Sequence, residues 1–523
     1  MRPLGVELAA MLADRGVNTV FGIPGVHNVE LYRGIENAGL RHILTRHEQG
    51  AGFMADGYAR ATGRPGVCFV ISGPGLTNIM TPMGQAYSDS VPMLVIATVL
   101  DETAAKRGQL HQMRDQEGAA RAVCDWSETA RTADAAYALV DQALGEFQND
   151  RQRPKAINLP IQILSEGAGA PPEKSSELPR EPITNDVDPT HDIINSKRPL
   201  FIFGGGARDS AAEANLVLDR LGAASFTTYA GRGIVRSENP LHFGSYLARA
   251  DSASVISSAD LIVAVGTELA EVDFWRETFE ADAPIIRVDL DLAVLSDARG
   301  ARDLVQSDAR EFLTKLSECL ETHEPATEWT PEKVATTRAR WKAEIDADRT
   351  GIVPICDALR EALPKNTMIY SDMTQFAYAA KEVWDMPAPG LWHHPYGFGT
   401  LGYALPAAIG GAVGYDGPVL AIAGDYGFQY TMQELGTAAE LGLNLPIMIW
   451  DNDALAEIRD CMVKAQIAPN AVTQVNPDWS YLAQAYGCGF AEPHSIDELC
   501  AAINDGFSAA RPTLIRAVPG RLA

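Results

Sequence analysis

The chain repeats one pattern three times: a short apolar run, a glycine-rich turn and a stretch with helical spacing. Short apolar strands that alternate with helices form parallel βαβ units, whose helices cover both faces of the sheet. The repetition therefore predicts an α/β protein with three doubly wound parallel-sheet domains. We place these domains at residues 1–167, 188–322 and 345–523, between stretches rich in Pro, Ser, Thr and Glu.

Ten short apolar runs are the predicted strands of these domains. They are residues 19–23, 42–45, 67–72, 93–98, 200–203, 261–265, 285–288, 367–370, 419–423 and 446–450. Helical spacing predicts helices over residues 49–61 and 433–441. Ligands of such sheets bind in the loops that follow the carboxyl ends of the strands.

Composition narrows the choice of partners. The net charge of −25 repels nucleic acid and anionic lipid. Glu7 and Asp14 interrupt the first apolar stretch, which is typical of an amphipathic helix and not of a signal peptide. The longest apolar run, residues 91–100, is shorter than the roughly 20 residues needed to span a bilayer. We therefore expect a soluble, cytoplasmic protein that binds neither nucleic acid nor membrane.

Two predicted strands of the third domain end in polar side chains. Residues 419–423 lead into Gly424 and Asp425, and residues 446–450 lead to Asn452, 27 positions after Asp425 (452 − 425). A carboxylate and an amide oxygen at one sheet edge suit Mg²⁺, which also binds phosphate oxygens, and a helix N-terminus favours an anion. The pattern predicts a metal that bridges a diphosphate, although an ordinary βα turn is an equal alternative.

This pair of turns resembles the signature of the thiamine diphosphate enzymes. The resemblance implies that Asp425, Asn452 and the backbone carbonyl of Ala454 hold Mg²⁺. The chain departs from the family at two positions, with Tyr426 where the family usually has Gly and Asp451 where it usually has Asn. Neither departure removes a metal ligand, but Tyr426 could impose a different turn.

The first domain contains a longer match. Its sequence TRHEQGAGFMADGYAR, at residues 45–60, resembles the family's cofactor-activating segment. The resemblance implies that Glu48 hydrogen-bonds N1′ of the aminopyrimidine. A carboxylate there favours the imino tautomer, whose 4′-nitrogen removes the C2 proton of the thiazolium. A lone Glu at a helix start would otherwise be a cap that the helix dipole favours.

Four further segments, residues 21–25, 72–75, 372–375 and 397–402, resemble family turns around the cofactor. The cofactor-binding residues that the resemblance implies are Pro24, Glu48, Ser72, Asn78, Thr374, Gln375, Gly399, Leu401, Gly424, Asp425, Tyr426, Gly427 and Asn452. The three domains would then be pyrimidine-binding, central and diphosphate-binding. In this family Glu48 and Asp425 would serve one cofactor from different subunits, so a homodimer or homotetramer is implied.

The closest resemblance is to the acetolactate synthase-like branch, and within it to decarboxylases of 5-guanidino-2-oxopentanoate. Acetolactate synthases have Phe-Gln where this chain has His111 and Gln112, and a Met and a Trp after the Asn turn that it lacks. We therefore expect decarboxylation of a 2-oxo acid to an aldehyde and CO₂, with His27, Glu48, His111 and Gln112 as catalytic residues. A carboligase that forms a hydroxyketone is the alternative, and a scaffold without catalysis is a third hypothesis.

Three assignments keep competing interpretations. His111 could relay a proton or be a surface loop residue. Glu457 could pair with the guanidinium of a substrate or lie on a solvated helix face. Gly204, Gly205 and Gly206 follow a strand but lack the full GxGxxG spacing. Because the segment around residues 266–269 also lacks the arginine that flavin-binding relatives carry, we expect no FAD.

Overall fold

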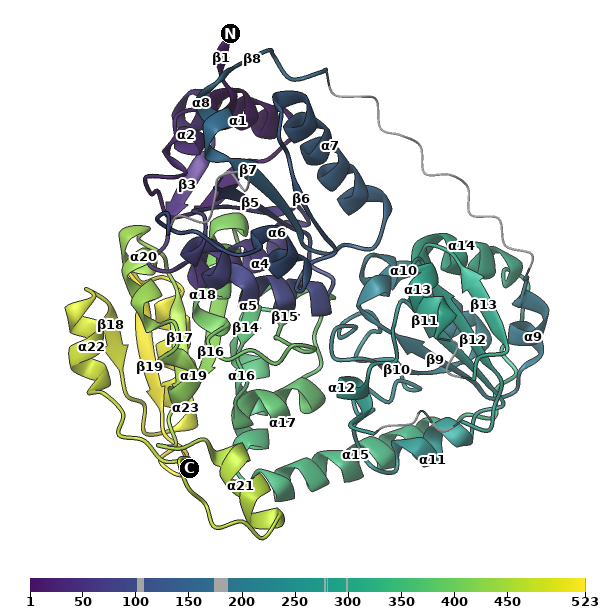
Figure 1. Cartoon of the computed structure of the whole chain (residues 1–523). Helices are drawn as coiled ribbons and strands as arrows, with labels where there is room; N and C mark the ends of the chain where they lie inside the picture. Colours follow the sequence, from purple (N-terminus) through teal and green to yellow (C-terminus); the bar gives the residue numbers. More distant parts are fainter. Residues whose placement is uncertain (101–107, 174–186, 277–278, 280, 298–299, 523) are drawn as a thin grey trace.

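The computed structural model describes residues 1–100, 108–173, 187–276, 279, 281–297 and 300–522. These residues form parallel sheets of six, five and six strands, together with an antiparallel pair of Arg2–Pro3 (β1) and Gly167–Ala168 (β8). Helices cover both faces of each large sheet (Figure 1). The predicted fold of three doubly wound parallel sheets is confirmed, whereas the domain boundaries stay predictions. Residues 174–186 of the predicted first linker lie outside the described residues.

The first sheet has the strand order β3-β2-β4-β5-β7-β6. Its strands are β2 (Thr19–Gly22), β3 (Arg41–Leu44), β4 (Gly66–Val70), β5 (Met93–Val99), β6 (Trp126–Thr129) and β7 (Lys155–Pro160). Its helices are α1 (Leu4–Asp14), α2 (Val29–Tyr32), α3 (Ile35–Ala38), α4 (Glu48–Thr62), α5 (Pro74–Ser88), α6 (Gln116–Arg121), α7 (Ala133–Asn149) and α8 (Ile161–Ser165). Strands β4 and β5 are buried along their whole length, as apolar strands between two helical layers should be.

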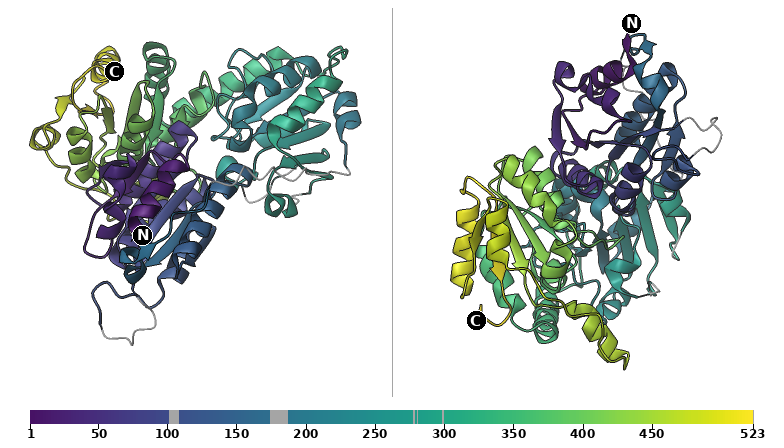
Figure 2. Two further views of the ribbon diagram at one scale, coloured as in Figure 1. Left: turned by 90° about the horizontal axis from the view of Figure 1, so that it is seen from above. Right: turned by 60° about the vertical axis from the view of Figure 1, so that its left-hand side comes forward.

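The central sheet has the strand order β10-β9-β11-β12-β13. Its strands are β9 (Pro199–Phe203), β10 (Ala224–Thr227), β11 (Leu261–Val265), β12 (Ile285–Asp289) and β13 (Asp303–Gln306). Its helices are α9 (Thr190–Asn195), η1 (Gly205–Ser210), α10 (Ala211–Leu221), α11 (Ser252–Ser257), α12 (Glu271–Phe274), α13 (Leu292–Ser296) and α14 (Ala309–Cys319). Helix α15 (Pro331–Asp348) then leads from this sheet to the third one, and the central sheet lies to one side of the other two (Figure 2, left).

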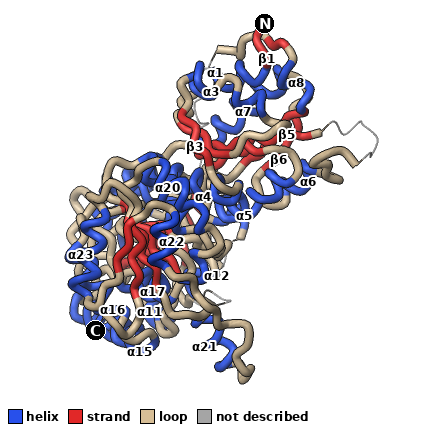
Figure 3. Tube along the Cα trace, turned by 90° about the vertical axis from the view of Figure 1, so that its left-hand side faces the viewer, coloured by secondary structure: helices blue, strands red, loops and turns tan. Residues whose placement is uncertain are grey.

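The third sheet has the strand order β15-β14-β16-β17-β19-β18. Its strands are β14 (Met368–Ser371), β15 (Trp392–His393), β16 (Val419–Gly424), β17 (Pro446–Trp450), β18 (Gly489–Ala491) and β19 (Thr513–Ala517). Its helices are α16 (Ile352–Ala362), α17 (Gln375–Val383), α18 (Ala404–Gly414), α19 (Asp425–Phe428), η2 (Met432–Glu434), α20 (Leu435–Glu440), α21 (Ala456–Lys464), α22 (Trp479–Ala485) and α23 (Ile496–Gly506). Helix α21 projects from the body of the protein (Figure 3).

The first and third sheets share one hydrophobic core, and helices α4 and α18 pack against each other between them (Figure 1). Their backbones come so close that a Cβ atom on Gly57 would lie 1.9 Å from the carbonyl oxygen of Ala407. Across the same contact, the Tyr403 hydroxyl donates to Asp56 Oδ1 at 2.6 Å. The helix that begins with Glu48 is therefore fixed between two domains of its own chain.

All ten predicted strands are present, with ends shifted by no more than a few residues. The predicted helix at residues 49–61 is α4, and the one at residues 433–441 is divided into η2 and α20. No helix among the described residues is both long enough and apolar enough to cross a membrane.

Candidate active site

Three neighbouring strands of the third sheet bring the predicted cofactor loops together. Strand β16 pairs in parallel with β14 on one side and with β17 on the other. The carboxyl ends of all three therefore meet at one sheet edge, where ligands of doubly wound sheets bind. The loops at this edge are residues 372–375, 424–427 and 451–454.

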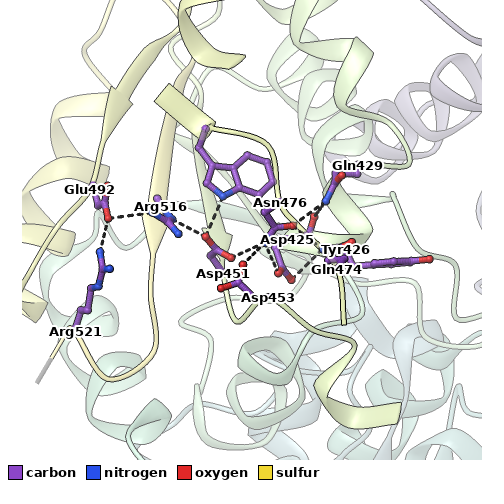
Figure 4. Close-up of polar contacts among 11 residues, drawn as sticks. Asp425, Tyr426, Gln429, Asp451, Asp453, Gln474, Asn476, Glu492, Arg516 and Arg521 are labelled. Atoms are coloured by element: carbon purple, nitrogen blue, oxygen red, sulfur yellow. Dashed lines mark hydrogen bonds and ion pairs between the residues drawn. The ribbon is translucent and has the colours of Figure 1, made fainter. Parts of the chain in front are cut away.

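Asp425 lies in a cluster of three carboxylates at this edge (Figure 4). It is the first residue of α19 and is 2% exposed. One oxygen each of Asp425, Asp451 and Asp453 lie within 4.8 Å of one another. The amide nitrogen of Asn476 lies between them, 2.8 Å from Asp425 Oδ2, 2.8 Å from Asp451 Oδ1 and 3.0 Å from Asp453 Oδ1. An amide has only two hydrogens for these three acceptors.

Asp451, one of the departures from the family pattern, has its charge compensated. Its Oδ2 accepts from Arg516 Nε at 2.5 Å and from Trp479 Nε1 at 2.9 Å. A single guanidinium thus balances one of three carboxylates, so the cluster keeps an excess of negative charge. Burial raises the pKa of Asp425, and the Asp451 carboxylate adds to this, whereas the hydrogen bond from Asn476 lowers it. A divalent cation with oxygen ligands fits such a donor set.

The other two predicted metal ligands, Asn452 and Ala454, have different contacts. The Asn452 amide donates to Gln375 Oε1 at 3.1 Å, and its own Oδ1 accepts from the backbone N–H of Ala454 at 3.2 Å. The structure thus joins Asn452 to a predicted cofactor residue of the β14 loop, while the carboxylates gathered around Asp425 are Asp451 and Asp453. The predicted set of Asp425, Asn452 and the Ala454 carbonyl stays a prediction.

Tyr426 does not disturb the turn after β16. It lies inside α19, and its φ is not in the left-handed region, so this position does not require glycine. Next to it, a Cβ atom on Gly427 would lie 3.5 Å from Leu401 Cδ2, which places Leu401, a predicted cofactor-binding residue, beside this turn. Gly399 precedes Leu401 in the same loop, and Thr374 is buried just before α17.

Asp372 holds the loop that contains Leu401. Its side chain accepts from the backbone N–H of Met373 at 2.8 Å and from that of Gly402 at 2.8 Å. Burial raises the pKa of Asp372 to about 6, although these backbone donors act in the opposite direction. The loops after β14 and before α18 are therefore one hydrogen-bonded unit.

Glu48 is the first residue of α4 in the N-terminal domain and is 9% exposed. Its Oε2 accepts from Asn78 Nδ2 on α5 at 2.9 Å. The N-cap of the helix is His47, whose Nδ1 accepts from the backbone N–H of Gln49 at 3.1 Å. Glu48 is therefore not needed as a cap and presents a carboxylate that is held by one neutral partner.

The two histidines predicted to be catalytic, His27 and His111, are in contact in the N-terminal domain. The rings of His27 and His111 lie edge to face with centroids 4.9 Å apart, and His27 Nδ1 is 2.6 Å from Ser72 Oγ. Burial, and to a smaller extent His111, lower the pKa of His27. His111 Nδ1 is buried without a hydrogen-bond partner among the described residues. Gln112 instead accepts from the backbone N–H of Gln109 within its own loop, and Pro24 is exposed after β2.

Sequence reasoning missed three polar residues that support these groups. Gln116 accepts from the backbone N–H of Gly73 at 3.0 Å, next to Ser72. Glu434 is fully buried and accepts from the backbone N–H groups that precede Glu48. Asn476 joins the carboxylate cluster. Of these, only Glu434 had a local signal, a Glu at the start of a predicted helix nine positions after Asp425.

Comparison with known proteins accounts for this arrangement. Residues 4–119 match the N-terminal TPP-binding domain of thiamine pyrophosphate enzymes, residues 190–316 their central domain and residues 372–517 their C-terminal TPP-binding domain. The chain is 41% identical to the probable 2-ketoarginine decarboxylase of Pseudomonas aeruginosa, over 98% of this chain and 93% of that protein. The chain belongs to the thiamine pyrophosphate enzyme family.

More distant family members are acetolactate synthases. The large subunit of Parasynechococcus marenigrum is 30% identical, over 93% of this chain and 83% of that protein. Isozyme 1 of Escherichia coli is 28% identical, over 85% of this chain and 80% of that protein. Thiamine pyrophosphate is another name for thiamine diphosphate, so the predicted family, its two cofactor-binding domains and the assignment as an enzyme are confirmed.

The glycine turn of the central domain differs from the turns of the two TPP-binding domains. The backbone N–H of Gly204 donates to Val265 O at 2.9 Å, and that of Gly206 donates to Gly266 O at 3.0 Å. In a nucleotide site, such N–H groups would face the phosphates. Here they bind the end of the neighbouring strand β11, which gives the glycines a structural role.

Glu457 has a partner within the chain. Its carboxylate forms two hydrogen bonds with the guanidinium of Arg349, Nε to Oε1 at 3.1 Å and Nη2 to Oε2 at 3.1 Å. Arg349 caps α15, and Glu457 lies in the first turn of α21. Neither interpretation from the sequence anticipated this pair, which fastens α21 to the helix that leads from the central domain.

Proposed function

We propose that this chain decarboxylates a 2-oxo acid to an aldehyde and CO₂, with bound thiamine diphosphate and Mg²⁺. When bound, thiamine diphosphate supplies a nucleophilic carbon. It also supplies an electron sink for the electron pair of the C1–C2 bond that breaks when CO₂ leaves. The observation that carries the proposal is Glu48, a nearly buried carboxylate with the neutral partner Asn78, at the start of a fixed helix in a TPP-binding domain. Such a group can hold a proton at N1′ of the aminopyrimidine.

The diphosphate end of the cofactor would bind at the edge of the third sheet. Asp425, Asn452 and the Ala454 carbonyl would hold Mg²⁺, and Thr374 with Gln375 would contact the diphosphate. The excess of carboxylate at this edge supports a cation there. The hydrogen bond between Asn452 and Gln375 supports a joint role for these loops.

The histidine pair provides a route for the proton that aldehyde release requires. Because burial lowers the pKa of His27, its ring is neutral near pH 7 and can accept a proton. Ser72 orients that ring through Nδ1. His111 lies against it, and its buried Nδ1 has no hydrogen-bond partner in the part of the chain that the structure describes. We assign proton transfer to His27 and His111, with Gln112 as a polar neighbour on the same loop.

The proposed substrate is 5-guanidino-2-oxopentanoate, also called 2-ketoarginine. The relative at 41% identity, the probable 2-ketoarginine decarboxylase of Pseudomonas aeruginosa, supports this choice. We also propose that the working unit is a homodimer or homotetramer in which Glu48 of one chain and Asp425 of another serve one cofactor. The family membership supports such an assembly.

The test is a product assay with purified protein, thiamine diphosphate and Mg²⁺. Equimolar CO₂ and 4-guanidinobutanal from 5-guanidino-2-oxopentanoate, with much slower turnover of pyruvate and of the uncharged 2-oxopentanoate, is the expected result. Glu48→Gln serves as the inactive control. Turnover of the guanidino acid no faster than that of pyruvate would refute the substrate, and CO₂ release that persists in Glu48→Gln would refute the mechanism.

A carboligase is the second candidate, and the relatives named acetolactate synthases favour it. It would release CO₂ but would deliver a 2-hydroxyketone in place of the aldehyde. Acetolactate synthases have Phe where this chain has His111, before a shared Gln, and this difference argues against a carboligase. The same assay separates the two, because the products differ in mass and in reactivity towards aldehyde reductases.

A further inference from the structure

Glu434 is a fully buried carboxylate at the junction of the two TPP-binding domains. It is the last residue of the turn η2, nine positions after Asp425, and its exposed fraction is 0%. Burying a carboxylate is costly unless hydrogen bonds compensate it. Its hydrogen-bond partners are Arg46, His47 and Thr437 and not the carboxylates around Asp425, so its position calls for a separate explanation.

Glu434 accepts hydrogen bonds from backbone groups near the start of the chain and from a residue of its own domain. Its Oε1 accepts from the backbone N–H of Arg46 at 3.1 Å and from that of His47 at 3.0 Å. Its Oε2 accepts from Thr437 Oγ1 at 2.8 Å, within its own domain. The approach leaves no room for a side chain at Gly50, where a Cβ atom would lie 2.2 Å from Glu434 Oε1.

These two backbone groups immediately precede Glu48. Helix α4 begins at Glu48, and His47 is its N-cap. The N–H groups at the start of a helix have no partner within the helix, and those just before it are equally free to find one elsewhere. Their hydrogen bonds to Glu434 fix the path of the backbone into α4. They thereby fix the position of the Glu48 backbone, from which its side chain extends.

The segment that ends at Glu434 is itself tied to the cofactor loops. It begins at Asp425, and on the way the Thr431 hydroxyl donates to Gly402 O at 2.8 Å. The backbone N–H of Gly402 donates to Asp372 at 2.8 Å. Residues 425–434 therefore connect the sheet edge of the third domain to the start of α4 through buried hydrogen bonds.

We propose that Glu434 is a positioning residue for Glu48, whose carboxylate holds the start of α4 in the place that cofactor activation requires. This inference rests on the role proposed for Glu48. It gives a reason for a buried acid at the junction of the two domains. Burial raises the pKa of Glu434 to about 7, although its bonds from Thr437, Arg46 and His47 oppose this. Strongly shifted groups of this kind are common at functional sites.

The variant Glu434→Gln tests the proposal because it keeps the size of the side chain and replaces one acceptor oxygen by an NH₂ donor. The readout is the exchange of the C2 proton of enzyme-bound thiamine diphosphate for deuterium, followed by NMR after acid quench. We expect exchange to slow by about 10- to 100-fold, as small displacements of a catalytic group do. The affinity for thiamine diphosphate with Mg²⁺ should stay within about twofold, since diphosphate and metal contacts are unchanged.

Two further variants make the result interpretable. Glu440→Gln removes the ion pair that joins Glu440 to the Arg46 side chain, at 2.6 Å, without touching the Arg46 N–H. It should exchange like the parent protein. Glu434→Asp keeps the charge but shortens the side chain, so it should also slow exchange. It replaces Glu434→Gln as the test if Glu434→Gln does not fold. Exchange at the parental rate in either folded Glu434 variant would overturn the proposal.

The same assay separates failure of this inference from failure of the proposed function. If exchange is fast in the parent, slow in Glu48→Gln and fast in Glu434→Gln, then Glu48 activates the cofactor and Glu434 does not position it. If Glu48→Gln exchanges as fast as the parent, the role of Glu48 itself is wrong. The assay needs no 2-oxo acid, so an error about the substrate does not affect it.

Discussion

Glu48 and Asp425 occupy equivalent places in two sheets and have opposite surroundings. Each is the first residue of a helix that follows a parallel strand, and each is nearly buried. Among the described residues, the Glu48 carboxylate has one hydrogen-bond partner, the neutral amide of Asn78. Asp425 shares the amide of Asn476 with two other carboxylates.

The difference shows how the surroundings of a carboxylate decide what it can bind. A solitary carboxylate with one neutral donor keeps an oxygen for a hydrogen bond to a ring nitrogen. Crowded carboxylates repel one another and gain most from a cation. The position at a helix start is common to both, so it does not determine the role.

Removing the solitary carboxylate should have the largest effect. Glu48→Gln keeps the size of the side chain but cannot share a proton as a carboxylate does, so kcat should fall by about 10²- to 10⁴-fold. The measurement is CO₂ release at saturating 2-oxo acid. Glu36→Gln, on the exposed side of α3, is the matched control and should retain parental activity. A fall of less than tenfold in Glu48→Gln would remove the main contrast between the two sites.

A third carboxylate, Asp372, predicts a pH dependence of stability. Burial raises its pKa to about 6, so between about pH 4 and pH 6 the folded protein holds a proton that the unfolded chain has lost. This stabilisation is complete below pH 4 and disappears as the pH rises through 6, a change of up to about 3 kcal/mol. Urea unfolding should show a larger loss of stability between pH 4 and pH 7 in the cofactor-free parent protein than in Asp372→Asn, where other buried acids such as Glu434 still titrate. Equal pH dependence in both proteins would contradict this account.

Loss of Asn476 should weaken the crowded site to a smaller extent. Without its amide, Asp425, Asp451 and Asp453 lose their shared donor, and Asp425 Oδ2 loses the bond that orients it, while Oδ1 keeps the backbone N–H of Tyr426. Because residues that orient metal ligands contribute in this range, Asn476→Ala should lower Mg²⁺ affinity by about 10- to 100-fold.

Titration calorimetry in the presence of thiamine diphosphate measures this affinity. Asn470→Ala is the matched control, since Asn470 is exposed and its side chain bonds within its own loop, to Ala468 O at 3.1 Å. Unchanged affinity in Asn476→Ala would mean that the three carboxylates do not support the metal site. The contrast between Glu48 and Asp425 as proton-holding and cation-binding carboxylates would then fail.

The smallest effect is expected at Glu457. Its guanidinium partner is Arg349, so a substrate guanidinium would have to displace a pair that already exists. Glu457→Gln should therefore change the ratio of kcat/KM for the guanidino acid over 2-oxopentanoate by less than threefold, and the loss of a partly exposed pair should cost below about 1 kcal/mol of stability. A drop of tenfold or more in that ratio would instead assign Glu457 to the substrate tail.

The sequence predicted those parts of the fold that depend on local apolar patterns. Strands β4, β5, β16 and β17 are continuous apolar runs and were found where expected. Strand β7 was missed although it is buried throughout, because it contains a lysine and an asparagine. Lys155 is tolerated there through Asp125, 3.1 Å away and 30 positions earlier. Such compensation by distant residues has no local signal.

The candidate site divides in the same way. Asp425 and Asn452 could be predicted because strand ends and spacing place them at one edge, and Glu48 because a long segment resembles the family. Asn476 lies 51 positions after Asp425, beyond a helix, and Glu434 contacts His47 across 387 positions. Their roles depend on how loops fold back, which neither periodicity nor spacing encodes.

The central claim is that Glu48 and Asp425 act on the same cofactor from different chains. It is tested most directly by combining two inactive variants in one dimer. Glu48→Gln and Asp425→Ala are co-expressed with different affinity tags, and mixed dimers are isolated by tandem purification. If one cofactor takes Glu48 from one chain and Asp425 from the other, each mixed dimer contains one intact site and should show about half of the parental activity. Mixed dimers as inactive as the two parent variants would contradict a site shared between chains.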